Sequence, residues 1–203
     1  MSSVADRRRQ VRETREQTRA RIVAAATELL RKRSFTELTV DEVMRAAGQG
    51  RTIFYRHFDD LPDLLLRASR DAVEELYAAQ ARLGSAREVP PRDTVREALR
   101  LAVAVHRRDG PLLRAVAEAA AADDRIAAAR ERMIGRFDDL LAAWLGEVTS
   151  RSGRAPADPA QTARALNLLN QAYLLDAFGH EPRVDPEAAV TTLGEIWIAV
   201  SGV

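Results

Sequence analysis

Residues 39–58, with the sequence TVDEVMRAAGQGRTIFYRHF, constrain the fold of this chain more than any other segment. They open with the pattern T-x-x-E, in which the Thr39 hydroxyl and the Glu42 carboxylate each pair with a backbone N–H at a helix start. Gly48 stands where a left-handed residue would end this helix, and Gly50 stands where the next helix would be capped. The segment therefore predicts a capped helix, a tight turn and a short second helix over 51–57, which together form a helix-turn-helix.

The remainder of the chain also favours helices over strands. Alanine, the best helix former, is abundant, aromatic residues make up only 5% of the chain, and no long run alternates β-branched residues. We predict an all-α fold of about nine helices, two of which are separated by the sequence Asp109-Gly110-Pro111. The expected helices cover about 15–33, a short stretch after Thr39, 51–57, 61–83, 93–107, 112–121 and 124–149, and two more begin after the caps Asp158 and Asp185.

The second helix of the predicted helix-turn-helix carries apolar and polar residues on different faces. Ile53, Phe54 and Phe58 suit the core, whereas the polar side chains suit the major groove of DNA. An arginine at 51 or 56 can pair with guanine O6 and N7, and the nearby hydroxyl and imidazole groups suit phosphates. Gln49 either reads an adenine or faces water. Each of these polar residues, taken alone, also fits the solvent-exposed surface of an ordinary helix that does not contact DNA. Together they predict DNA contacts from Thr39, Gln49, Gly50, Arg51, Thr52, Tyr55, Arg56 and His57.

Charge is distributed unevenly along the chain. Residues 1–58 contain 13 Lys or Arg and 7 Asp or Glu, a balance of +6, whereas the remainder contains 18 and 23, a balance of −5. This asymmetry indicates that only the front of the chain meets a polyanion. We expect a flexible basic arm over 1–14, a DNA-binding domain over 15–60 and a second helical domain over 61–203. The arm either contacts phosphates or the minor groove, or it serves as a solubilising tail.

Composition argues against several function classes. The absence of cysteine excludes disulfides, thiolate zinc sites and thiol catalysis. No apolar stretch reaches about 18 residues and the N-terminus lacks a signal-peptide core, so we expect a soluble, cytoplasmic protein without membrane contact. The three histidines, His57, His106 and His180, lack the spacing of metal ligands, and we expect no metal, no cofactor and no catalytic residue. The rival interpretation is a helical-bundle enzyme that uses His106, Asp176 and His180.

Residues 47–58 resemble the DNA-binding domain of the TetR family of transcriptional repressors, whose motif is close to A-G-V-S-x-x-T-hydrophobic-Y-x-H-F. The matching residues are Ala47, Gly48, Phe54, Tyr55, His57 and Phe58. Gln49, Gly50 and Ile53 depart from the motif, and Leu61 stands where the family often has a phosphate-binding lysine. The resemblance implies an N-terminal three-helix DNA-binding domain and a C-terminal helical bundle. This bundle would bind a small apolar ligand and dimerise through its last two helices.

The segment LNLLNQAYLLDAF, residues 166–178, places two amides on one stripe with core-type residues. Asn167, Asn170, Leu174 and Phe178 fall at i, i+3, i+7 and i+11. A buried amide without a partner costs about 1–3 kcal/mol, so each finds one in a ligand carbonyl, a neighbouring helix or a dimer mate. With Trp197, the segment resembles the ethionamide-activation repressor branch of the TetR family. In that branch two such asparagines and a tryptophan line a long hydrophobic tunnel.

Other pocket positions of that branch differ here. His106 and Leu175 fall where phenylalanines would align, and Phe137 falls near a tryptophan position, which implies a ligand of different shape. Phe137 belongs to an apolar stripe that suits either core packing or the wall of a cavity. The predicted ligand contacts are His106, Phe137, Leu140, Leu141, Trp144, Asn167, Asn170, Leu174 and Trp197.

These features predict a homodimeric, ligand-responsive repressor that binds a palindromic operator in double-stranded DNA. A small, largely apolar effector would favour a conformation in which the two DNA-reading parts have the wrong spacing, and would thereby release the DNA. The alternative is a dimeric DNA-binding regulator with a filled C-terminal core and no effector.

Overall fold

The computed structural model describes residues 4–85, 91–152, 156 and 158–202. Over these residues all regular secondary structure is helical, with eight α-helices, one short 3₁₀ helix and no strand, so the predicted all-α fold is confirmed. The elements are α1 (Val4–Leu30), η1 (Phe35–Glu37), α2 (Val40–Ala46), α3 (Arg51–Phe54), α4 (Leu61–Ser85), α5 (Pro91–Ala119), α6 (Asp124–Ser152), α7 (Pro159–Phe178) and α8 (Pro186–Ser201).

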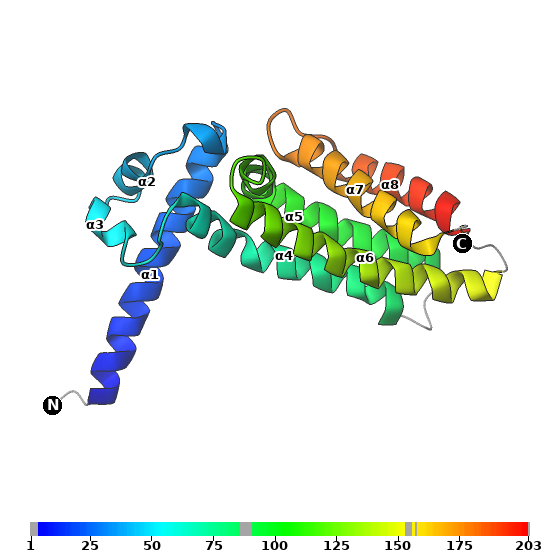
Figure 1. Ribbon diagram of the computed structural model, residues 1–203, viewed down its shortest axis with the longest axis horizontal. Helices are drawn as coiled ribbons and strands as arrows, with labels where there is room; N and C mark the ends of the chain where they lie inside the picture. Colours follow the sequence, from blue (N-terminus) through cyan, green and yellow to red (C-terminus); the bar gives the residue numbers. More distant parts are fainter. Residues whose placement is uncertain (1–3, 86–90, 153–155, 157, 203) are drawn as a thin grey trace.

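The helices form two bodies (Figure 1). α1, η1, α2 and α3 form the smaller body, the head, and α4–α8 form a helical bundle beside it. The core of the head is built from large apolar side chains of every α-helix in it, including Ile22, Leu30, Val43, Phe54 and Phe58. Burying each such side chain contributes about 1.5–3 kcal/mol, which stabilises helices as short as α2 and α3 that would not persist alone.

Three helices of the bundle also reach the core of the head, namely α4, α5 and, through Ile126 in its first turn, α6. The first turns of α4 bury Leu64 and Leu65 there, while its later turns pack along α5 and α6. The last turns of α5 contribute Leu112, Ala115 and Ala119 to the same cluster. Because these side chains are packed among those of the head, a displacement of α4 or α5 within the bundle changes the packing of the head.

The expected break at Gly110 and Pro111 is wrong, because α5 is one helix of 29 residues that runs through both. Pro111 has no N–H for the carbonyl of Arg107, one turn earlier. Arg183 supplies the missing donor, since its Nη1 lies 2.9 Å from that carbonyl oxygen. A Cβ atom at Gly110 would overlap the carbonyl oxygen of Phe178, so glycine permits α5 to approach the end of α7. These contacts explain why eight α-helices, rather than nine, are present in the described residues.

The first and third helices also differ from their predicted bounds. α1 begins at Val4, so residues 4–14 of the segment expected to be an arm are helical, and residues 1–3 lie outside the described residues. Residues 4–14 contain neither glycine nor proline and include four Arg, one Gln and one Glu, which propagate a helix readily once the head has nucleated it. α3 ends at Phe54, and Tyr55 is its C-cap, so His57 lies beyond the helix.

The helix caps expected from the sequence are confirmed. Thr39 Oγ1 accepts from the N–H of Glu42 at 3.3 Å, and Glu42 accepts from the N–H of Thr39 at 3.1 Å, which completes the capping box. Asp158 and Asp185 each accept a hydrogen bond from the N–H three residues later, at 3.0 and 2.9 Å. These local interactions position the starts of α2, α7 and α8.

Candidate functional site

The turn between α2 and α3 has the tight geometry of a helix-turn-helix. Gly48 adopts φ +65°, in the left-handed region that favours glycine. Its N–H donates to the carbonyl of Arg45 at 3.2 Å, and the N–H of Gln49 donates to the carbonyl of Met44 at 2.9 Å. These two bonds form a Schellman motif that ends α2 and directs the chain into α3. The predicted turn is confirmed.

The predicted DNA-contact residues gather on and around α3. Arg51, Thr52, Tyr55 and Arg56 are exposed, and the Tyr55 ring is unusually open for a large aromatic residue at 51% exposed. The remaining predicted residues flank this face: Gly50 is exposed at the start of α3, and Gln49 and His57 are half-buried at either side. Thr39 is exposed at the start of α2, where its hydroxyl also donates to Glu42 at 2.8 Å within the capping box.

Arg51 is held by two neighbours. Its Nη1 lies 3.0 and 3.1 Å from the two carboxylate oxygens of Asp41, and its Nη2 donates to the Tyr55 hydroxyl at 3.2 Å. The hydrogen bond to Tyr55 and the charge of Asp41 raise the pKa of Arg51 further above its ordinary value. The pair joins α3 to α2, and DNA must displace Asp41 to engage every donor of Arg51. Asp41 is a part of this face that the sequence did not reveal.

Three arginines and His57 form a cluster beside α3, and the sequence did not reveal two of these arginines. Arg15 and Arg19 lie one turn apart on α1, and Nη2 of Arg15 donates to the carbonyl of Arg56 at 3.3 Å. Burial, followed by the charges of Arg15, Arg19 and Arg56, lowers the pKa of His57. No carboxylate of a described residue pairs with these three guanidinium groups. The four side chains, the basic cluster, therefore form a surface suited to phosphate groups.

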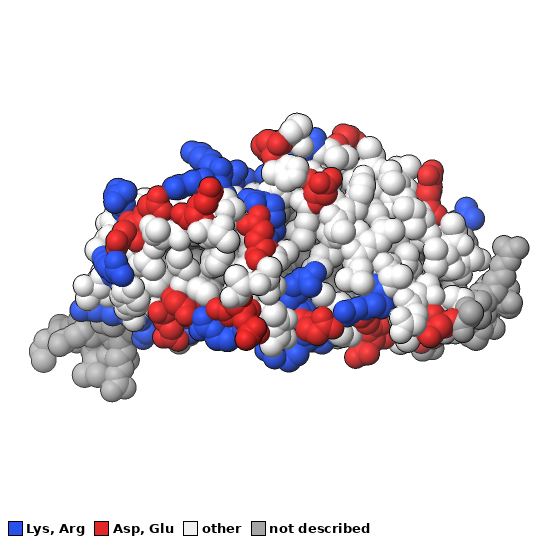
Figure 2. Space-filling model, turned by 45° about the horizontal axis from the view of Figure 1, so that its top comes forward, with Lys and Arg blue, Asp and Glu red and all other residues white. Residues whose placement is uncertain are grey.

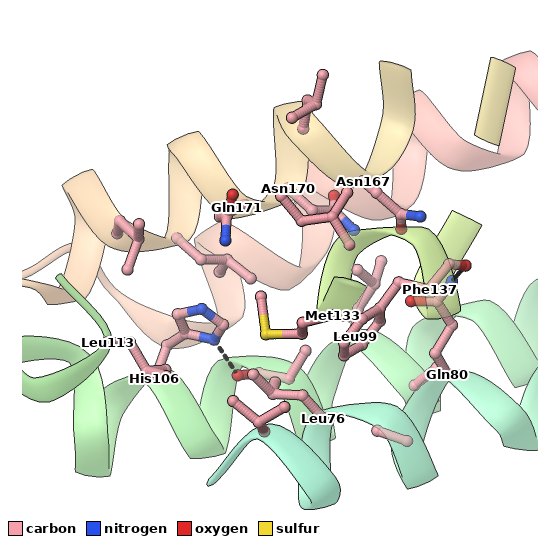
Figure 3. Close-up of a pocket in the computed structure, with 18 of the residues that line it drawn as sticks. Leu76, Gln80, Leu99, His106, Leu113, Met133, Phe137, Asn167, Asn170 and Gln171 are labelled. Carbon is pink, nitrogen blue, oxygen red and sulfur yellow. Dashed lines mark hydrogen bonds between the residues drawn. The ribbon is translucent and has the colours of Figure 1, made fainter. Parts of the chain in front are cut away.

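A cavity lies inside the bundle, lined by residues of α4, α5, α6, α7 and α8. The centres of water-sized molecules can reach about 120 Å³ of it, roughly ten times the space that one buried water needs. Figure 3 shows His106 and Leu113 towards one end, Gln80 and Phe137 towards the other, and the α7 amides along one side. Most of the wall is aliphatic, as is usual for sites that bind apolar ligands.

Six of the nine predicted ligand contacts line this cavity: His106, Phe137, Asn167, Asn170, Leu174 and Trp197. Both asparagines have partners within the chain. Oδ1 of Asn170 accepts from Nε1 of Trp197 at 3.0 Å, and Nδ2 of Asn167 donates to Asp138 at 2.8 Å. These bonds fix the side chains and leave the amide nitrogen of Asn170 and the amide oxygen of Asn167 for a further partner.

His106 is buried and points an acceptor towards the cavity. Its Nδ1 lies 2.8 Å from the carbonyl oxygen of Ala102 and must carry the proton, since a carbonyl cannot donate (Figure 3). Burial lowers the pKa of His106, against smaller raising effects from Ala102 and Asp109, so the ring is neutral near pH 7. Neutral imidazole protonated at Nδ1 carries a lone pair at Nε2, which can accept from a ligand hydroxyl or amide.

Leu140, Leu141 and Trp144, which are also predicted ligand contacts, are not among the residues that line the cavity. Leu141 and Trp144 are buried in the bundle core, and the Trp144 ring packs behind Trp197 with centroids 6.4 Å apart. The C-terminal part of α6 therefore packs in the core, whereas Met133, Ile134 and Phe137, nearer its start, line the cavity. The cavity also includes residues absent from the prediction, among them Gln80, Arg130, Met133 and Gln171.

The three residues of the rival enzyme interpretation occupy different environments. His106 lies in the cavity, whereas the side chains of Asp176 and His180 are 85% and 54% exposed and pair with each other at 3.8 Å. Among the described residues, no three His, Cys, Asp or Glu side chains converge as a metal site would require. None of the helices in the described ranges combines the length and apolarity needed to cross a membrane.

A helix-turn-helix head joined to a helical bundle is the architecture of a DNA-binding transcriptional regulator, and sequence comparison agrees. Residues 22–68 match the family described as "Bacterial regulatory proteins, tetR family", and residues 95–201 match "Transcriptional regulator EthR, C-terminal domain". The chain belongs to the TetR family of transcriptional regulators, with a C-terminal domain of the EthR type. Members of this family bind DNA and dimerise.

Two curated relatives are similar over almost the whole chain. The HTH-type transcriptional regulator EthR of Mycolicibacterium smegmatis is 26% identical over 196 residues, which cover 94% of this chain and 89% of that protein. EthR of Mycobacterium tuberculosis strain H37Rv is 28% identical over 198 residues, which cover 94% and 90%. The resemblance noted in residues 166–178 and Trp197 therefore extends to both domains.

Solved structures share the fold. A TetR-family regulator from Syntrophomonas wolfei superposes with a TM-score of 0.72 at 13% identity, over 93% of this chain and 96% of that one. The TetR-family regulator PfmR of Thermus thermophilus gives 0.71 at 20% identity, over 86% and 96%.

Proposed function

We propose that this protein is a homodimeric repressor that binds a palindromic operator and is released from it by a small, largely apolar effector in the cavity. The observation that carries the proposal is the course of α4. Its first turns pack Leu64 and Leu65 in the head, and nine to twelve residues later Val73 and Leu76 line the cavity. One rigid helix therefore contacts both the DNA-reading body and the space for a ligand. Operator binding also implies a cytoplasmic location.

The exposed face of α3 supports DNA binding by the head. Arg51 or Arg56 can pair with a guanine, and Gln49 lies at the turn where a base edge comes within reach. Thr52, Tyr55 and His57 suit phosphates, and Thr39 and Gly50 offer groups at the starts of α2 and α3. The basic cluster adds Arg15 and Arg19 of α1 to the phosphate contacts.

The outer face of α7 and α8 supports dimerisation. These helices contain 36 residues, of which only four are charged (Arg164, Asp176, Glu187 and Glu195), about 11% against 30% for the whole chain. Leu168, Leu169 and Val200 are 40%, 38% and 40% exposed on them. Figure 2 shows a broad field without charged side chains in this part of the molecule. Burying such a face against a second copy would remove it from water and set the distance between the two heads.

Arg114 provides a second route between the ligand domain and the head. From α5, its Nη2 donates to the carbonyls of Leu30 and Arg33 at the end of α1, at 2.8 and 3.2 Å. Its Nε donates to the carbonyl of Gly179 after α7 at 3.0 Å, and its Nη1 pairs with Glu118. Glu118 in turn accepts from the N–H of Phe35 at 3.0 Å.

The neighbours of Arg114 on α5 place this set of contacts next to the cavity. Leu113, Val116 and Ala117 line the cavity wall on the same two turns of helix. A ligand that displaces this wall therefore alters the hydrogen bonds that hold the end of α1. The effector can weaken operator binding only by as much as its affinity differs between the two arrangements.

Operator binding can be tested by fluorescence anisotropy with duplexes from the region upstream of the protein's own gene. We expect one palindromic duplex to bind two chains, with an affinity that falls steeply as salt rises, because each phosphate contact adds about −0.9 to the slope of log K against log salt. Methyl decanoate, a neutral apolar probe, should weaken this binding. Salt-independent binding, or none to any duplex, would contradict the DNA-binding role. Operator binding unaffected by any probe would instead favour the regulator without an effector.

A further inference from the structure

The cavity wall contains an arginine that forms no ion pair with any carboxylate of the described residues. Arg130, on α6, is the single charged residue among the described residues that line the wall. Its Nη2 donates to Oε1 of Gln171, which also lines the cavity. Its Nε is shielded from water and has no acceptor. Within the described part of the chain, Arg130 forms no ion pair with Asp or Glu.

The carboxylates around Arg130 are engaged by other arginines. Glu131, the next residue, pairs with Arg164 at 3.0 Å, and Asp138, two turns further along α6, pairs with the same Arg164 at 3.1 Å. Arg136, on α6 as well, pairs with Glu74 at 3.0 Å and lies over the ring of Tyr77, 4.1 Å from its centroid. The half-buried guanidinium of Arg130 thus differs from those of Arg136 and Arg164, which are both neutralised within the protein.

An unpaired guanidinium in an apolar cavity calls for an anionic partner. A buried N–H without an acceptor costs about 1–3 kcal/mol, and the planar guanidinium matches the two oxygens of a carboxylate. Gln171 would contribute a second donor, since its Oε1 already accepts from Arg130 and its Nε2 makes no hydrogen bond with a described residue. From Arg130 to Phe137 the cavity follows α6 for seven residues, or about 10 Å, along an apolar wall.

We propose that the effector is an amphipathic anion, a monocarboxylate with an alkyl chain of medium length. Its carboxylate binds Arg130 and Gln171, and its chain lies along the wall towards Phe137. This assignment rests on the proposed function, because it concerns the ligand that enters the same cavity.

The test compares three probes of equal chain length: decanoate, methyl decanoate and 1-decanol. Their affinities for the full chain are measured by isothermal titration calorimetry at pH 7.5, and in parallel by release of the operator duplex. We expect decanoate to bind more tightly than the ester or the alcohol. Arg130→Met should weaken decanoate binding about 10- to 100-fold, the range of a charge-assisted hydrogen bond, and change ester binding less than about twofold.

Two further variants keep the result interpretable. Gln171→Glu places a fixed carboxylate beside Arg130, so it should abolish the preference for decanoate while raising the melting temperature. Arg136→Gln removes an arginine of the same helix that lies outside the cavity wall, so it should leave decanoate affinity unchanged. Melting curves of all variants show whether a lost affinity reflects loss of folding.

The outcomes separate the carboxylate assignment from the proposed function. Ester and alcohol binding as tight as that of decanoate, or an equal loss for all probes in Arg130→Met, would overturn the carboxylate assignment while the apolar effector stands. If Arg130→Met does not fold, Gln171→Glu is the deciding variant. If Gln171→Glu still binds decanoate more tightly than the ester and the alcohol, as the unchanged protein does, the carboxylate assignment is wrong. If no probe binds the folded protein, the assignment and the proposed effector fail together.

Discussion

Nη1 of Arg183 lies 2.9 Å from the carbonyl oxygen of Arg107 and takes the place of the helical donor that Pro111 lacks. This contact allows α5 to continue from the far end of the bundle to the head. It predicts that Arg183→Ala destabilises the protein by about 0.5–1.5 kcal/mol. In a Pro111→Ala background the backbone supplies its own N–H, and the cost should be smaller. Urea denaturation of the two single variants and the double variant measures the coupling. If Arg183→Ala lowers the free energy of unfolding equally in both backgrounds, the loss comes instead from the contact of Arg183 Nε with Glu181 Oε1, which are 3.1 Å apart.

Gly110 and Gly135 are both helical glycines, but a side chain has room at only one of them. A methyl group at Gly110 would meet the Phe178 carbonyl, whereas at Gly135, on α6, nothing lies within 4 Å. We expect Gly110→Ala to destabilise by about 1–3 kcal/mol and Gly135→Ala to stabilise by about 0.5–1 kcal/mol. Thermal melting of the two variants provides the measurement. A neutral Gly110→Ala would mean that α5 and α7 separate easily at this crossing.

The basic cluster predicts contacts that depend on charge and not on base sequence. Arg15→Gln and Arg56→Gln should each lower operator affinity and reduce the salt slope by about 0.9. The affinity for an unrelated duplex, measured by competition, should fall by the same factor, because a phosphate contact carries no sequence information. Arg136→Gln, far along the bundle, serves as the matched control for removal of one positive charge. A changed sequence preference in Arg15→Gln would argue for base contact instead.

His57 predicts a dependence of operator affinity on pH. Its pKa in the free protein is lowered by burial and by the charges of Arg15, Arg19 and Arg56. DNA phosphates would offset those charges and raise the pKa, so the complex holds more protons than the free protein in the window between the two values. Affinity should therefore rise as pH falls through this window, within about pH 5 to 8, and level off above it. Titrations at constant ionic strength would show this trend, and His57→Gln should flatten it.

The hydrogen bonds of Arg114 predict that its replacement uncouples ligand binding from DNA binding. Arg114→Ala removes the donors that hold the carbonyls of Leu30 and Arg33. The ratio of operator affinities without and with methyl decanoate should therefore move towards one, while the probe still binds. Arg108→Ala is the matched control, because Arg108 lies on the same helix and pairs only with Glu75 and Asp109 among the described residues. An unchanged ratio in Arg114→Ala would leave α4 as the route of coupling.

The local features of the DNA-reading head were predictable because neighbours in sequence determine them. The Thr39–Glu42 capping box needs partners only three residues apart, and the left-handed Gly48 ends a helix by bonds to its own last turn. The pairing of Asp41 with Arg51 could not be predicted from the sequence, because ten residues and a turn separate them. The helical stripe of α7 likewise predicted that Asn167 and Asn170 share a face, although not what each one contacts.

The sequence by itself determined the all-helical fold, the helix-turn-helix, most helix starts and six of the nine predicted cavity residues, since helix periodicity and caps act over a few residues. Only the tertiary structure decided whether α5 breaks at Pro111, because the replacement donor, Arg183, lies 76 residues along the chain from Arg107, whose carbonyl it binds. Tertiary packing likewise placed Leu141 and Trp144 in the core, and it left Arg130 in the cavity wall without an ion pair to any described carboxylate. These outcomes depend on which side chains meet across helices, and that is set by the packing of the whole bundle.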